Sequence, residues 1–428
     1  MNIRRFIRIG FLCCLVLSAF CSNRGDKKQT TDTEILNKAK DIHEKAMVMD
    51  THLDIEVTFV WPKLLPYIKG DMIALEDNLV TLNKMEEGGL DAAFFAVYIP
   101  QTPVSENGFR VAFDTAMVKF KAIHKMLEEH HDRIELALNA DDVPRILSEG
   151  KKVAMIGIEN GYALGKDINN LKKFYDLGCR YITLCHGGHN QICDSSINPD
   201  GPEALYNGLS DYGKEVVVEM NRLGIIIDIS HLSKKSMLDV LQLSKAPVIA
   251  SHSSCLSLCN VHRNLDDEQL LALKENGGVI NIVAINSFIK EDPAGMRKEL
   301  SDIRNEFNFS SHYWPSYFEF KKAPEEIQNS YNKRINKFYE KYPPADIADF
   351  VDHIDHAVNL IGAEHVGISS DFFEPDHCIE GWRDASETFN ITLELVKRGY
   401  SRKKIEQIWG GNLLRVWTGV KKTTSDIK

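Results

Sequence analysis

The chain has 428 residues, of which 43% are hydrophobic and 26% are charged, and its formal net charge is −10. This composition supplies a sizeable core and excludes wholesale disorder, and a negative charge without a basic stripe argues against a nucleic acid partner. The length exceeds that of a usual domain, but barrels of alternating strands and helices fill such a length as one unit, so we expect one large domain that acts on a small molecule.

The first residues are typical of a secretory signal. Arg4 and Arg5 precede an apolar stretch at residues 9–20, and a polar run follows at residues 22–32. The apolar stretch is short for a membrane span, so we expect residues 1–21 to be a signal peptide, with a retained membrane helix as the alternative. Residues 22–32 would then be a polar linker of an exported protein.

Residues 17–21, Leu-Ser-Ala-Phe-Cys, also resemble a bacterial lipoprotein processing site. In that case Cys21 would be lipidated and would attach the protein to a membrane of the bacterial cell envelope. Phe20 departs from the small residue expected at its position, so plain secretion to the periplasm is the alternative. Both interpretations predict an exported protein.

Six cysteines lie beyond this leader, and none of them falls in a Cys-x-x-Cys pair. Export permits disulfides without requiring them, and the spacing gives no support for a zinc site made of thiolates. We therefore expect buried free thiols at Cys179, Cys185, Cys193, Cys255, Cys259 and Cys378.

From residue 33 onward, short apolar runs alternate with amphipathic stretches. After an amphipathic helix at residues 33–45, the runs that predict strands are 46–50, 92–99, 153–158, 181–185, 225–229, 248–251, 278–283 and 365–369. The predicted helices include 117–129, 168–177, 211–223 with Ser210 as the N-cap, 233–243 and 266–275. Eight repeats of strand and helix predict an α/β fold, a (β/α)8 TIM-like barrel that forms a single domain over residues 33–428.

The regular alternation stops at residues 287–349, a stretch rich in charged and aromatic residues. This stretch is predicted to be an insertion after the seventh strand. Segments that follow strands lie on the catalytic face of such a barrel, so a lid or substrate wall is one interpretation. A helical decoration without a catalytic part is the other.

Histidines and carboxylates fall near the ends of the predicted strands. Because the C-terminal ends of parallel strands share one rim of a barrel, side chains distant in sequence converge there on one pocket. Imidazole and carboxylate groups are the ligands that zinc prefers. The residues are His52, Asp54, Glu159, His186, His231, His252 and Asp371.

Each of these signals is weak by itself. His52 and Asp54 are two residues apart, so in an extended segment both can reach one ion, but a capping or salt-bridged pair has the same spacing. Glu159 ends an apolar strand, where an unpartnered carboxylate would cost several kcal/mol and a metal ion would compensate its charge. A lone histidine at a strand end is more often a satisfied core residue.

Taken together and in order, these motifs resemble membrane dipeptidase, the renal dipeptidase family of zinc metallopeptidases. The resemblance runs from about Ala46 to Trp417. Its landmarks are Asp50-x-His52-x-Asp54, Glu87-Gly88-Gly89, Gly157-Ile158-Glu159-Asn160-Gly161, Tyr181 to His186, Asp228-Ile229-Ser230-His231, Ser251-His252-Ser253-Ser254, Arg263-Asn264, Gly367 to Phe372 and Gly411 to Val416.

The resemblance implies two Zn²⁺ per chain. His52 and Asp54 would hold one ion, His231 and His252 the other, and Glu159 would bridge them. Two bridged ions lower the pKa of a shared water, so that a metal-bridging hydroxide can attack the peptide bond of a dipeptide near neutral pH. An exported dinuclear zinc dipeptidase is therefore expected.

Three further roles follow from the resemblance. Asp371 would take and pass on the proton, His186 would contact the scissile carbonyl, and Arg263 would bind the free carboxylate of the substrate. A fixed arginine near the metals would select dipeptides, and the resemblance implies that these include dipeptides with a D-residue at the second position. A structural carboxylate at Asp371 and packing or surface roles for the other two are the alternatives.

The residues argue against two other classes of function. Amidohydrolase or phosphotriesterase barrels usually open with His-x-His and often use a bridging lysine, whereas this chain has His52-x-Asp54 and Glu159. A surface-attached binding protein without activity would have lost ligands, and every expected ligand type is present. His189 follows the His186 motif and is expected to be a loop residue. A homodimer is expected by analogy with the family.

Overall fold

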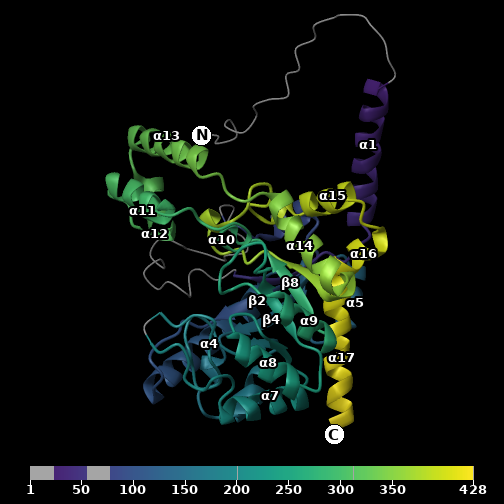
Figure 1. The fold of residues 1–428 in the computed structure, drawn as a ribbon, viewed down its shortest axis with the longest axis vertical. Helices are drawn as coiled ribbons and strands as arrows, with labels where there is room; N and C mark the ends of the chain where they lie inside the picture. Colours follow the sequence, from purple (N-terminus) through teal and green to yellow (C-terminus); the bar gives the residue numbers. More distant parts are fainter. Residues whose placement is uncertain (1–23, 55–77, 200, 312, 428) are drawn as a thin grey trace, which may run out of the picture.

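A barrel of parallel strands forms the centre of the molecule (Figure 1). The computed structural model describes residues 24–54, 78–199, 201–311 and 313–427. Along the barrel the strands are β1 (Met49–Leu53), β2 (Ala92–Tyr98), β4 (Lys152–Glu159), β5 (Cys179–Thr183), β6 (Ile226–Asp228), β7 (Ile249–Ser253), β8 (Val279–Val283) and β9 (Val366–Ser369). The predicted (β/α)8 barrel is confirmed.

Backbone hydrogen bonds between the segment after β9 and residues 52–54 at the end of β1 bring the two ends of the sheet together. The amide of Asp371 donates to the carbonyl of His52 at 3.0 Å, and the amide of Asp54 donates to the carbonyl of Phe372 at 3.2 Å. The eight strands therefore form a nearly closed barrel, whose first and last strands place His52 and Asp371 beside each other.

The first strand differs from its prediction at residues 46–50. Residues 51–53 continue β1, so His52 lies within the strand. The polar Thr51 is accommodated there because its hydroxyl donates to the carbonyls of Ser251 at 2.8 Å and Ile368 at 3.0 Å. A short strand, β3 (Ile134–Leu136), pairs with β4 outside the barrel path and was not predicted, because three residues carry too little pattern.

Side-chain caps fix the starts of several helices around the barrel. Helix α7 (Asp211–Leu223) has the predicted bounds, and the hydroxyl of Ser210 accepts from the amide of Gly213. Helices α8 (Lys234–Leu243) and α9 (Asp267–Glu275) begin after Ser233 and Asp266, and α6 (Asn169–Asp176) agrees within one residue at each end. Helix α4 (Glu106–Glu129) is longer than the predicted 117–129, because Ser105 caps it.

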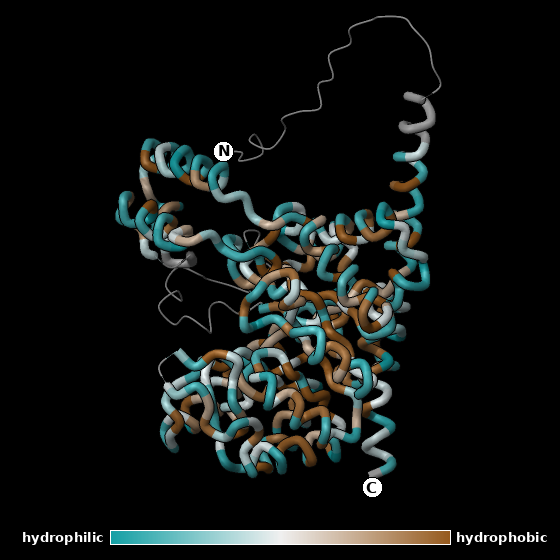
Figure 2. The backbone as a smooth tube through the Cα atoms, viewed as in Figure 1, coloured by the Kyte–Doolittle hydropathy of each residue, from teal (hydrophilic) through white to brown (hydrophobic). Residues whose placement is uncertain are grey.

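Among the residues that the structure describes, six further helices belong to the layer around the barrel. They are α1 (Arg24–His43), α3 (Leu82–Gly88), α5 (Asp142–Ser148), α15 (Phe389–Lys397), α16 (Arg402–Glu406) and α17 (Asn412–Ile427). Apolar residues gather toward the barrel and polar residues toward the outer helices (Figure 2). Helix α1 begins at Arg24, so most of the segment expected as a polar linker, residues 22–32, is helical.

The insertion after β8 is helical. It contains α10 (Asn286–Ile289), α11 (Met296–Glu306), α12 (Tyr313–Lys322) and α13 (Glu325–Lys341), before α14 (Ile347–Ile361) returns to the barrel. Helices α11, α12 and α13 lie together at one side of the molecule (Figure 1). Phe309 packs against Phe307 and Tyr331, so these helices have a small aromatic cluster of their own.

None of the helices in the described part of the chain combines the length and the apolar sequence that a membrane span requires. The predicted signal peptide, residues 1–21, and the candidate lipidation site Cys21 lie outside the described residues. The six cysteines beyond the leader are buried and unbridged, as predicted.

Candidate metal centre

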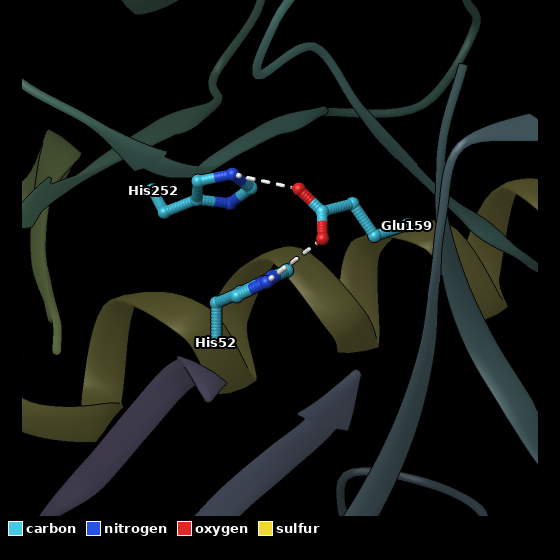
Figure 3. Close-up of side chains that lie close together, drawn as sticks. All are labelled: His52, Glu159 and His252. Carbon is cyan, nitrogen blue, oxygen red and sulfur yellow. Dashed lines mark ion pairs between the residues drawn. The ribbon is translucent and has the colours of Figure 1, made fainter. Parts of the chain in front are cut away.

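Glu159, at the end of β4, is the centre of a cluster of histidines. Its Oε1 atom lies 2.9 Å from Nε2 of His231, 3.3 Å from Nε2 of His252 and 3.6 Å from Nε2 of His186. Its Oε2 atom lies 3.5 Å from Nε2 of His52. Figure 3 shows the carboxylate between the rings of His52 and His252. Four strand ends thus deliver imidazoles to one carboxylate that is only 6% exposed.

Two groups of these side chains have ligand atoms within 4.8 Å of one another. One group is His52, Glu159 and His252, and the other is Glu159, His186 and His231. Glu159 belongs to both groups, as expected for a ligand that bridges two metal ions. Nε2 of His231 and Nε2 of His252 also lie 2.9 Å apart, so the two groups are continuous. Asp54 belongs to neither group, although it lines the same cavity.

Unpartnered polar atoms test whether these residues fit a metal ion. Nε2 of His52 and Oδ1 of Asp54 are buried and have no hydrogen-bond partner in the described part of the chain. Such atoms cost free energy unless a cation or a donor compensates them. Imidazole nitrogens and carboxylate oxygens are also the donor set that zinc prefers. The residues therefore fit a divalent metal ion.

The outer ring nitrogens of two histidines are held by hydroxyl groups. Nδ1 of His52 lies 2.7 Å from the hydroxyl of Tyr181, and Nδ1 of His252 lies 2.7 Å from Oγ of Ser251. The Ser251 hydroxyl in turn donates to Asp228 at 2.6 Å. These contacts orient the rings with Nε2 toward Glu159, which is how metal-ligating histidines are commonly fixed. No such role was predicted for Tyr181, Ser251 or Asp228.

The absence of a side chain at Gly157 leaves room for the ring of Tyr181. The two residues are partners across β4 and β5, and a Cβ atom on Gly157 would lie 2.1 Å from Cζ of Tyr181. A side chain at position 157 is therefore incompatible with this ring position. The glycine of the Gly157-Ile158-Glu159 motif thus allows Tyr181 to reach His52.

Two residues of the site have a left-handed backbone. The φ angle is 68° at His231 and 53° at Asp371. Non-glycine residues in this region cost on the order of 1–3 kcal/mol, and such strain is concentrated at functional sites. The amide of Asp371 donates to His52, which helps to hold its unusual conformation.

The electrostatics of the site reflect crowded carboxylates and imidazoles. Burial raises the pKa of Asp54 to about 6, and Glu159 adds to this shift. Burial also raises the pKa of Asp371 to about 7, against the opposing charge of His52. Burial, and then the charge of Arg263, lowers the pKa of His231. Burial therefore disfavours the charged forms of Asp54, Asp371 and His231, and a bound cation would compensate the two carboxylates without protonating His231.

A cavity of about 320 Å³ opens on the cluster. Among the predicted site residues, those that line it are Asp54, Glu159, His186, His231, Arg263 and Asp371. His52 and His252 lie behind this wall and contact Glu159. All eight predicted site residues are therefore part of one connected site. His189 does not line this cavity, and its Nδ1 accepts from the amide of Ser195 in a buried loop, as expected.

Arg263 has a fixed position beside the cluster. Its Nη2 donates to the carbonyl of His252 at 3.0 Å, and its guanidinium lies 5.2 Å from the ring centre of Phe288. Phe288 and Arg297 belong to the insertion and line the cavity. The insertion thus forms part of the cavity wall, which favours its interpretation as a lid or substrate wall over that as a helical decoration. Its individual residues could not be assigned from sequence, because only the fold brings them to the rim.

The chain is similar to known dipeptidases. Residues 36–428 match the family model described as membrane dipeptidase (peptidase family M19). The chain is 32% identical to the dipeptidase tcpJ of Claviceps purpurea over 79% of this chain and 68% of the relative. It is 31% identical to the dipeptidase verJ of Clonostachys rogersoniana over 81% of this chain and 77% of the relative.

The chain is also similar to a solved structure, over nearly the whole length of both chains. The crystal structure of the probable dipeptidase PvdM from Pseudomonas aeruginosa has a TM-score of 0.75 and 30% sequence identity. The similarity covers 91% of this chain and 99% of that chain.

Proposed function

The chain belongs to the membrane dipeptidase family, peptidase family M19, and on this premise we propose that it is an exported enzyme that uses two zinc ions to hydrolyse dipeptides. The observation that carries this proposal is the Glu159 carboxylate, which has four imidazole nitrogens within 3.6 Å at the edge of a cavity. The relatives named dipeptidases support the substrate class.

His52 and Asp54 would hold one zinc ion, His231 and His252 the other, and Glu159 would bridge them. The unpartnered buried atoms of His52 and Asp54 support the first set, and the facing Nε2 atoms of His231 and His252 support the second. When bound, the ions would polarise the scissile carbonyl and activate a water molecule.

Asp371 would take the proton and deliver it to the leaving amine. Its carboxylate is buried beside the cluster, with Oδ1 at 3.8 Å from Nε2 of His52. A pKa near neutrality suits a group that both accepts and donates a proton. His186 lines the cavity with Nε2 3.6 Å from Glu159, so it would stabilise the charge that develops on the carbonyl oxygen.

Arg263 would bind the free carboxylate of the dipeptide. Because its guanidinium donates to the carbonyl of His252, the distance between the carboxylate-binding group and the metal cluster is fixed. A fixed distance selects substrates in which one residue separates the scissile bond from the C-terminal carboxylate. The cluster and Arg263 together thus account for a preference for dipeptides.

The export and assembly of the protein are further parts of this proposal. The basic residues and apolar stretch at the N-terminus support a signal peptide. Cys21 supports attachment to the cell envelope through a lipid. A homodimer is proposed by analogy with the family alone.

The proposal is tested with purified full-length protein, a panel of dipeptides and a chelator. We expect two zinc ions per chain, turnover of dipeptides, loss of turnover after chelation and its recovery with zinc. Dipeptide amides, which lack the C-terminal carboxylate, should be poor substrates. Metal-dependent turnover of esters or lactams without dipeptide turnover would overturn the substrate class, and full activity without metal would overturn the metal centre.

A further inference from the structure

A second cavity of about 280 Å³ lies between the insertion and the loop that follows β9. It contains none of the metal-cluster residues, but it meets the first cavity at Ser287, Arg297, Glu374 and His377, which line both. A group bound at the metal centre therefore has a charged region beside it, built by the insertion and the β9 loop.

Most of the charge in this region is paired. Arg297 lies 2.6 Å from Asp292, and Arg304 forms an ion pair with Asp376. The hydroxyl of Tyr339 also donates to Asp376, at 3.2 Å. Two guanidinium groups and two carboxylates thus compensate one another.

Glu374 is the third carboxylate of the region, and its side chain is only 16% exposed. Among the described residues its single ion-pair contact is Nε2 of His377, at 3.9 Å. Burial and then the charge of Arg297 lower the pKa of His377 to about 4, so this histidine is neutral at pH 7. Burial raises the pKa of Glu374 to about 7, against the opposing charge of Arg304, which is itself paired with Asp376. The junction of the two cavities is therefore a place where a cation is favourable.

We propose that Glu374 is a specificity-determining residue that binds the side-chain cation of a dipeptide containing lysine or arginine. This inference rests on the proposed dipeptidase function. The α-ammonium of a dipeptide is close to the scissile bond and hence to the metal cluster, whereas Glu374 faces the junction with the second cavity. A long basic side chain reaches that junction, and Phe288 and Phe373 in the cavity wall offer apolar contact for its methylene groups.

The test compares lysine with norleucine, which has a similar apolar stem and no ammonium group. The ratio of kcat/KM for Lys-Ala over Nle-Ala, and for Ala-Lys over Ala-Nle, is measured with the zinc-loaded native chain and with Glu374→Gln. We expect at least one ratio to exceed one in the native enzyme and to fall at least about tenfold in the variant, the effect of losing a hydrogen bond to a charged group. Turnover of Ala-Ala should stay within about twofold, since that substrate has no side-chain cation.

Two further variants sharpen the test. Glu306→Gln removes a carboxylate from the exposed face of α11 and should leave both ratios unchanged. Glu374→Lys should shift the preference toward dipeptides with an acidic side chain. Unchanged ratios in Glu374→Gln, or an equal loss for all substrates including Ala-Ala, would overturn the role of Glu374 while dipeptide turnover by the native enzyme stands. Absence of turnover of every dipeptide would instead overturn the proposed function and this inference with it.

Discussion

The Nε2 atoms of His231 and His252 lie 2.9 Å apart, and both face Oε1 of Glu159. Two neutral imidazole nitrogens attract each other only when one of them carries a proton between them. Nδ1 of His252 is engaged with Ser251, whereas Nδ1 of His231 has no partner among the described residues. A cation bound by both Nε2 lone pairs and by the carboxylate would remove the repulsion between the two nitrogens without protonating either ring.

The first prediction follows from this contact. His252→Ala removes one of the two nitrogens, so we expect the zinc content to fall from two ions to one and dipeptide turnover to fall at least about a hundredfold. Metal analysis of the purified variant and its kcat/KM provide the measurement. His356→Ala, which alters a histidine paired with Asp267 away from the cluster, is the control and should keep both ions. Full zinc content and activity in His252→Ala would refute the ligand assignment.

Asp371→Asn tests the proton-transfer role. Asparagine is nearly isosteric and tolerates the left-handed backbone at this position, where φ is 53°, so the variant should fold. We expect kcat to fall by roughly 10²–10⁴-fold, the usual contribution of a general acid or base. Zinc content should remain at two ions per chain, because Asp371 is not a proposed ligand. A kcat within twofold of the native value would show that the carboxylate is structural.

Arg263→Lys tests recognition of the substrate carboxylate. Lysine keeps the positive charge but loses the paired donors and the contact of the guanidinium with Phe288. We expect kcat/KM for dipeptides to fall by roughly ten- to a hundredfold, with a smaller change for dipeptide amides, which lack the group that Arg263 binds. Equal losses for the acids and the amides would indicate that Arg263 supports packing instead.

The pH dependence of stability can be predicted from His43, far from the cluster. Its Nε2–H donates to the carbonyl of Gly88 at 2.9 Å and its Nδ1 accepts from the hydroxyl of Thr392 at 2.7 Å, which fixes the neutral ring. Burial lowers the pKa of His43 below its ordinary value of 6.5. The unfolded chain therefore binds the proton more tightly, and the stability contributed by His43 is complete above pH 6.5 and decreases as the pH falls below it.

A matched pair of variants measures this contribution. The free energy of unfolding of the native chain should fall more steeply between pH 7 and pH 5 than that of His43→Gln, in which the side chain does not titrate. His131→Gln changes an exposed histidine and should show the native pH dependence. Parallel curves for the native chain and His43→Gln would contradict the prediction.

Much of the fold and site is encoded in local patterns. The cap at Ser210 and the apolar spacing were enough to give α7 its bounds, and polar residues at the ends of apolar runs identified Glu159 and His231. In a parallel barrel, residues that end different strands lie on one rim, because all the C-terminal strand ends are on the same side. The meeting of these side chains at one rim could therefore be predicted without knowing any distance, whereas their roles as metal ligands were inferred from the family resemblance.

Other features depend on contacts that no local pattern records. Strand β1 extends past its predicted end because hydrogen bonds from Thr51 to β7 and β9 stabilise a polar residue in the barrel. Phe288 and Glu374 reach the cavity through a helical insertion and a loop, whose paths periodicity does not specify. The contact between Tyr181 and His52 joins residues 129 positions apart, and it exists only because Gly157 leaves room.

That last contact supports a prediction about how the ring of His52 is held. Tyr181→Phe keeps the ring between its neighbours but removes the hydroxyl that lies 2.7 Å from Nδ1 of His52. The ring of His52 would then lose its fixed orientation, so we expect zinc affinity to weaken by roughly ten- to a hundredfold, as for other outer partners of metal ligands. Competition with a chelator measures this affinity, and an unchanged zinc affinity would show that the hydroxyl does not orient His52.

Gly157→Ala should disturb the same contact from the other side. Its Cβ atom would lie 2.1 Å from the Tyr181 ring, so the ring or the strand must move, and overpacking of this kind costs about 1–3 kcal/mol. Gly187→Ala is the matched control, because a Cβ there meets no atom within 4 Å. We expect a lower free energy of unfolding and weaker zinc binding for Gly157→Ala only. If its stability and zinc affinity equalled those of Gly187→Ala, the close approach of Tyr181 to β4 would not be what positions His52.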